Sequence, residues 1–164
     1  MNLVKLADYH MWANNRVRNK LLELGEEEYA KEVIPPYKSI KNLVIHSIIA
    51  VEYNLRLRVD GEEAHPEEIG EKIASMSIAE AMRHWEKIDK QLVEFATTHL
   101  DLEAVFPNFL REGEITVDHD DFFTQYLIHT AYHRSQIMSA LRMMEKEGIG
   151  TDYLFYLSHL AIDR

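Results

Sequence analysis

The chain has 164 residues, 46% hydrophobic and 28% charged, which is the balance of a soluble globular protein long enough to bury one core. The formal net charge of −10 argues against nucleic-acid binding, because such binding depends on basic side chains that neutralise phosphates. The absence of cysteine excludes disulfides, thiolate metal ligands and a cysteine nucleophile, so any metal site must use imidazole, carboxylate or water.

The N-terminal stretch MNLVKLADYHMWANN meets charged and amide side chains too early for the apolar core of a signal peptide. No later apolar run approaches the roughly 20 residues that cross a bilayer. We therefore expect a cytoplasmic protein without membrane partners, folded as a single domain over residues 1–164.

Helical periodicity first extends from Leu3 to Leu24, and it stops before Pro35–Pro36, which a helix interior does not accommodate. A second helix is predicted to begin after Ser39, a good N-cap, and to reach about Val59. Both segments place aliphatic side chains at the spacing of one helical face.

A third helix is predicted to begin at Ser77, where SIAE is a capping-box sequence, and to end near Thr98. Residues 104–117 contain β-branched and aromatic side chains around a Glu-Gly pair, which predicts a small hairpin. A fourth helix is expected from about Asp118 to Lys146, and a short fifth helix from Tyr153 to Ala161.

The connection between the second and third helices, residues 60–76, is far longer than the roughly 2 to 8 residues that join antiparallel helices. A connection of this length can run the whole length of a bundle and leave the two helices parallel. The sequence therefore predicts an all-α fold, a four-helix bundle with one long crossover.

The stretch HTAYHRSQ places His129 and His133 four residues apart, so that both rings project from one face of the fourth helix. Gln125 and Gln136 lie on the same polar stripe. The spacing alone is weak, since nine histidines in this length predict about half of one such pair by chance. The alternative is a pair of ordinary core histidines.

His46 strengthens the metal hypothesis, because it lies among aliphatic residues of the second helix. A buried imidazole must pair its nitrogens with a carbonyl, a carboxylate or a metal ion, and metal sites in bundles form between facing helices. The rings of His46, His129 and His133 would form an open site with a free position for water or substrate.

Further residues are candidates for a pocket or for contacts that orient the ligands. Gln136, and to a lesser extent Gln125, is suited to accept the second N–H of a histidine. The other candidates lie in the first two helices: His10, Trp12, Asn15 and Tyr53. No carboxylate is clearly placed beside the proposed ligands, so the sequence identifies no catalytic acid or base.

The stretches YHMWANNRV, SIKNLVIHSIIAVEY and HTAYHRSQIMSALR resemble the DinB/YfiT-like family of small metal-binding bundles. The resemblance covers most of the chain and implies an up-down-down-up bundle that commonly forms homodimers. It also implies a divalent metal ion, nickel or zinc, on three histidines that correspond to His46, His129 and His133. Characterised branches of the family include metal-dependent thiol transferases, hydrolases and isomerases.

Three hypotheses follow. The first is a metal-dependent hydrolase or thiol transferase, whose substrate would be a small molecule such as an external thiol. The second is a non-catalytic metal-binding bundle in a structural or stress-response role. The third is a metal-free dimeric bundle that acts through its helix faces.

Overall fold

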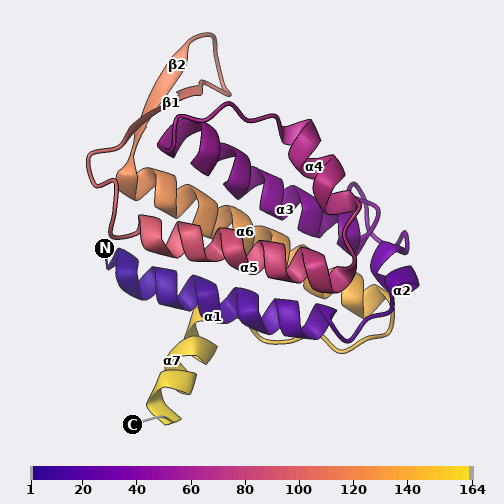
Figure 1. Ribbon diagram of the computed structural model, residues 1–164. Coiled ribbons are helices and arrows are strands. Elements are labelled where there is room, and N and C mark those ends of the chain that lie inside the picture. The colour runs from indigo at the N-terminus through magenta and orange to yellow at the C-terminus, as the bar shows by residue number, and fades with distance from the viewer. Residues whose placement is uncertain (1, 163–164) are drawn as a thin grey trace.

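Four helices form the body of the computed structural model, which describes residues 2–162. They are α1 (Leu3–Leu21), α3 (Ile40–Asn54), α5 (Ile78–Phe95) and α6 (His119–Met143). Figure 1 shows α3 and α5 running in one direction and α1 and α6 in the other. This is the up-down-down-up bundle, so the predicted fold class is confirmed.

The predicted starts of α3, α5 and α6 are also confirmed, and each of these three helices is capped by a side chain. Ser39 Oγ accepts from Asn42 N at 3.2 Å, and Asp118 Oδ1 accepts from Asp121 N at 2.9 Å. Ser77 forms the capping box with Glu80. The second predicted helix is not uniform, however, because its last turn, Leu55–Val59, is the π-helix η1.

The long crossover contains a helix that the sequence analysis treated as connection. This helix, α4 (Pro66–Ala74), has proline in its first turn and buries Ile69 and Ile73. Gly70 allows α4 to approach α3 closely, because a Cβ at this position would lie 3.0 Å from Ile49 Cδ1. A second short helix, α2 (Glu26–Ala30), follows α1.

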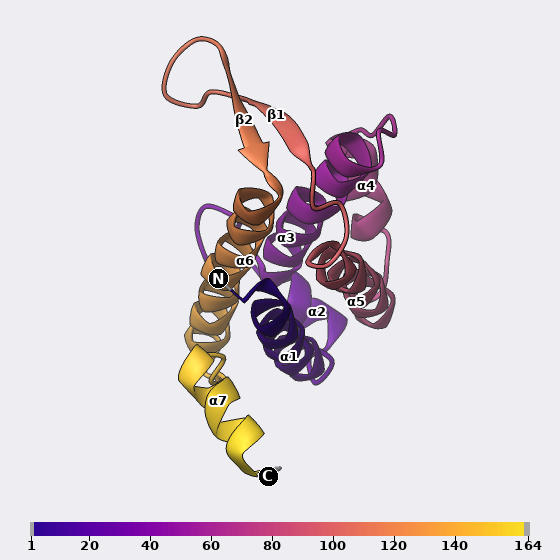
Figure 2. The same cartoon turned by 90° about the vertical axis from the view of Figure 1, so that its left-hand side faces the viewer.

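The predicted hairpin is present as β1 (Glu103–Pro107) and β2 (Glu114–Asp118), which pair antiparallel with Phe106 opposite Ile115. The predicted fifth helix is α7 (Tyr153–Ile162). Figures 1 and 2 show the hairpin and α7 projecting from opposite sides of the bundle. Within residues 2–162, no helix is both long enough and apolar enough to cross a membrane.

A buried polar network joins α1, α5 and α6 inside the apolar core. Its centre is Asp89 of α5, whose carboxylate accepts hydrogen bonds from His10 Nε2 at 3.0 Å and from Asn14 Nδ2 at 2.9 Å. Arg18 forms an ion pair with the same carboxylate. Arg134 of α6 donates to Asn14 Oδ1 at 2.8 Å, and this hydrogen bond connects α6 to the network.

Candidate metal centre

Three histidine side chains converge between α3 and α6. His46 comes from α3, and His129 and His133 come from successive turns of α6. One ring nitrogen from each lies within 4.8 Å of those from the other two. The ring centroids are 5.4 Å apart for His46 and His129, and 4.4 Å apart for His129 and His133. Such a group could hold a metal ion.

The donors present fit a divalent ion better than they fit a metal-free core. His129 Nε2 is buried and has no hydrogen-bond partner among the described residues. His133 Nδ1 donates to Gln136 Oε1 at 2.6 Å, which leaves the lone pair of Nε2 available as a ligand. Imidazole is a suitable ligand for zinc, nickel and copper. Apart from Gln136 Oε1, the described residues give these three rings no carbonyl or carboxylate partner of the kind that ordinary core histidines have.

The environment keeps these rings neutral, which is the state that binds metal. Burial, together with the neighbouring His133 and His46 rings, lowers the pKa of His129 to about 4. Burial lowers the pKa of His46 as well, and proximity to His133 adds to the effect. The pKa of His133 is lowered by burial despite the hydrogen bond to Gln136.

In metal-free protein, His129 should therefore stay neutral well below the pH at which a free histidine becomes charged. Its folded-state pKa, about 4, lies below the ordinary value of 6.5. The unfolded chain binds more protons between these values, so this ring reduces the stability of the metal-free fold as pH falls through that window. An NMR titration of the Cε1 proton measures this pKa, with the urea-unfolded chain as reference. A midpoint at or above the reference value would contradict the expectation.

Aromatic side chains border the cluster. The Tyr37 ring lies 4.8 Å from that of His46 and 5.5 Å from that of His133, measured between centroids. The Tyr132 ring lies 5.2 Å from that of His133. Tyr37 belongs to the loop before α3, and no periodicity or motif in the sequence marks it as a neighbour of the histidines.

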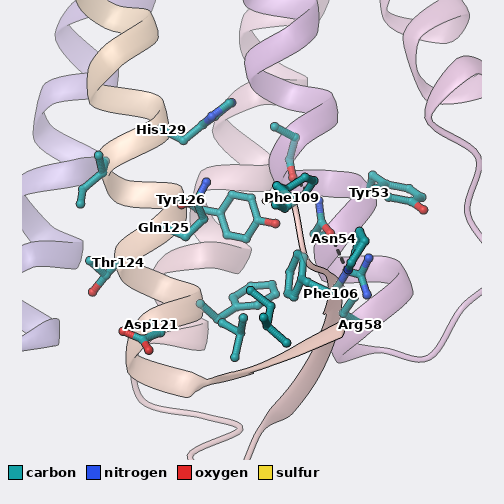
Figure 3. Close-up of a pocket in the computed structure, with 16 residues that line it drawn as sticks. Tyr53, Asn54, Arg58, Phe106, Phe109, Asp121, Thr124, Gln125, Tyr126 and His129 are labelled. Atoms are coloured by element: carbon teal, nitrogen blue, oxygen red, sulfur yellow. Dashed lines mark hydrogen bonds between the residues drawn. The ribbon is translucent and has the colours of Figure 1, made fainter. Parts of the chain in front are cut away.

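A cavity of about 770 Å³ adjoins the cluster, and His129 forms part of its wall. Tyr53 and Gln125, both predicted pocket residues, line it as well (Figure 3). The remaining walls come from η1, the hairpin and the first turns of α6. The cavity is within the 300 to 1,000 Å³ typical of small-molecule sites.

The other predicted pocket residues have different locations. Gln136 contacts His133, as expected for a residue that orients a ligand. His10 belongs to the Asp89 network, Trp12 packs its ring against Tyr156 of α7, and Asn15 accepts a hydrogen bond from Arg18. The structure therefore does not bring these three to the histidine cluster. They lie on α1, where His10 is buried toward α5, Trp12 faces α7 and Asn15 is exposed.

A nearby carboxylate is also directed elsewhere. Glu52 lies in α3 after His46, but its Oε2 accepts a hydrogen bond from His84 Nε2 of α5 at 2.6 Å. Six residues of α-helix rotate Glu52 about 120° from His46, which accounts for this separation. Within the described part of the chain, the group suited to metal consists of the three histidines without an acidic member.

Comparisons with known proteins bear on the family and the fold of the chain. The model of the DinB family matches residues 1–163. Protein DinB of Bacillus subtilis (strain 168) is 24% identical over 161 residues, which cover 93% of this chain and 92% of that protein. A crystal structure of a protein assigned to the DinB family from Exiguobacterium sibiricum 255-15 superimposes with a TM-score of 0.65 at 16% identity. It covers 88% of this chain and 93% of that one, and it supports the same fold.

Proposed function

This chain belongs to the DinB family, and on that premise we propose that it binds one divalent metal ion, nickel or zinc, through His46, His129 and His133. The observation that carries the proposal is the convergence of three ring nitrogens within 4.8 Å around a buried His129 Nε2 that has no other partner among the described residues. Three neutral imidazoles leave at least one coordination position open, which is typical of catalytic rather than structural sites.

We further propose that the protein is a metal-dependent hydrolase or small-thiol transferase. When bound, the ion would act as a Lewis acid that activates a water or thiol and polarises a substrate beside it. Gln136 fixes the orientation of the His133 ring, and the cavity beside His129 gives a small molecule access to the cluster. The thiol would have to come from a small molecule, because the chain contains no cysteine.

A non-catalytic role is the second candidate, because the three ligands come from two helices. An ion bound to His46 of α3 and to both histidines of α6 would tie these helices together and stabilise the bundle without turnover. We also propose that the protein is a cytoplasmic homodimer. Ile128 and Tyr132, exposed on α6, are apolar side chains of the kind that a partner copy would cover.

Elemental analysis of protein purified without an affinity tag tests metal binding, and we expect about one nickel or zinc ion per chain. A screen of small thiols and of hydrolysable esters and amides then separates the two candidates. Consumption of a substrate that stops on chelation supports the enzyme. A large fall in melting temperature on chelation, with no substrate consumed, supports the structural role. Protein without metal after incubation with nickel and zinc would contradict both.

A further inference from the structure

The cavity beside His129 is suited to a particular class of molecule. Its walls are mainly apolar, and five of the side chains are aromatic: Tyr53, Phe106, Phe109, Phe122 and Tyr126. Figure 3 shows Tyr126 and Phe109 inside this space, with His129 at one end and Arg58 at the other. Aromatic rings bury large apolar areas and stack against planar groups. The body of a suitable ligand is therefore apolar, with an aromatic ring favoured.

Arg58 provides a positive charge at the end of the cavity far from the histidines. Its guanidinium lies 4.0 Å from the centroid of the Phe106 ring, and its Nε donates to Asn54 Oδ1 at 2.8 Å. One further N–H donates to the Val105 carbonyl oxygen. These contacts hold the group in place but use only two of its five N–H donors. Among the described residues, no carboxylate pairs with Arg58, so its charge is uncompensated.

Within residues 2–162, the one carboxylate in the cavity wall belongs to Asp121, on α6. Figure 3 places Asp121 and Arg58 on opposite sides, with the aromatic side chains between them. An anion bound at Arg58 would therefore contact the guanidinium and lie on the side of the cavity away from the Asp121 carboxylate. A cation that stacked on the aromatic rings near Arg58, by contrast, would be repelled by the guanidinium.

We propose that the cavity binds a small organic anion with an aromatic or otherwise apolar body, whose carboxylate pairs with Arg58 and whose opposite end reaches the histidine cluster. The substrate class rests on the proposed function, since the reacting group would be the end at His129. Arg58 follows His46 by twelve positions, which corresponds to at most about 18 Å along the helix. A molecule of drug-like length can therefore extend toward both ends.

Two ligands that differ mainly in charge test whether the cavity prefers an anion. They are 6-phenylhexanoate and its neutral amide, 6-phenylhexanamide, and their Kd values are measured by calorimetry with both metal-free and metal-loaded protein. We expect the acid to bind more tightly than the amide. Arg58→Gln should weaken the affinity for the acid about 10- to 100-fold and leave the affinity for the amide nearly unchanged. The reason is that hydrogen bonds to charged groups contribute more than neutral ones. Arg58→Lys should retain the preference for the acid.

Matched control variants separate this effect from general disturbance. Arg56 lies on the same π-helix but pairs with Glu62, so Arg56→Gln should not change the affinity for the acid. At the hairpin, Phe109→Ala should weaken the binding of both ligands, whereas Leu110→Ala should weaken the binding of neither. Phe109 lines the cavity and Leu110 does not, although both are exposed, at 81% and 97%. Neither substitution is expected to unfold the chain.

Equal affinity for acid and amide, or equal effects of the Arg58 and Arg56 substitutions, would overturn the proposal. Failure of both ligands to bind would also overturn it. Metal content, measured on the same samples, distinguishes failure of the proposed metal site from failure of the proposed ligand class. If the protein held no metal but still preferred the acid through Arg58, the metal assignment would fail and the ligand class would stand.

Discussion

Replacing His129 with alanine should abolish stoichiometric metal binding while the bundle stays folded. The substitution removes the buried Nε2, which has no other partner within residues 2–162, and leaves two ligands. Loss of an outer-shell partner alone weakens metal affinity about 10- to 100-fold, and loss of a direct ligand should exceed that. Elemental analysis of untagged protein, followed by titration of the metal-free form with nickel or zinc, measures the effect.

Two other histidines provide the control for this experiment. His65 is exposed and lies beside Glu63, and His84 is paired with Glu52 on the far side of α3. Alanine at either position should leave the metal content unchanged. Circular dichroism should show full helix content in all three variants. A His129→Ala protein that kept a full complement of metal would rule out the three-histidine assignment.

Replacing Asp89 with alanine should cause the largest loss of stability of any single change considered. Asp89 is 1% exposed, and its carboxylate accepts hydrogen bonds from His10 and Asn14 in addition to its ion pair with Arg18. Its removal leaves a buried guanidinium uncompensated, which costs about 3 to 5 kcal/mol. For a domain of this size, that corresponds to a fall in melting temperature of roughly 6 to 20 °C. Thermal and urea denaturation measure both quantities.

Glu86, three residues before Asp89 on the same helix, serves as the matched control. Its carboxylate forms an exposed pair with Lys90, and such pairs contribute about 0 to 1 kcal/mol. Glu86→Ala should therefore change the melting temperature little. Comparable losses in the two variants would show that the buried network does not stabilise the bundle.

The Asp89 network should also make stability depend on pH in the acid range. Burial acts to raise the pKa of Asp89, but His10, Arg18 and Asn14 outweigh burial and lower it. A carboxyl with a lowered folded-state pKa stabilises the fold above its unfolded value of about 3.9, and this contribution is lost as pH falls further. The difference in unfolding free energy between wild type and Asp89→Ala should accordingly be constant near neutrality and shrink below about pH 4.

Much of the bundle could be predicted from sequence, because the signals that define it are local. Helical periodicity and the N-cap signals at Ser39 and Ser77 act within one or two turns. The spacing of His129 and His133 places them on one face for the same reason. The length of the connection from residue 60 to 76 was enough to indicate parallel helices, although α4 within it escaped notice. That helix spans only nine residues, and its buried face consists of Ile69 and Ile73.

Contacts between distant residues were decided by the tertiary structure alone. His10 appeared suited to a pocket, yet it pairs with Asp89, 79 residues away, because α1 packs against α5. Tyr37 borders the histidines and Arg58 closes the cavity, but neither lies in a motif. Whether His46 would meet the two histidines of α6 also depended on the packing of α3. The sequence determines which faces are apolar or polar; only packing determines which faces meet, because that depends on the summed contacts of all the helices.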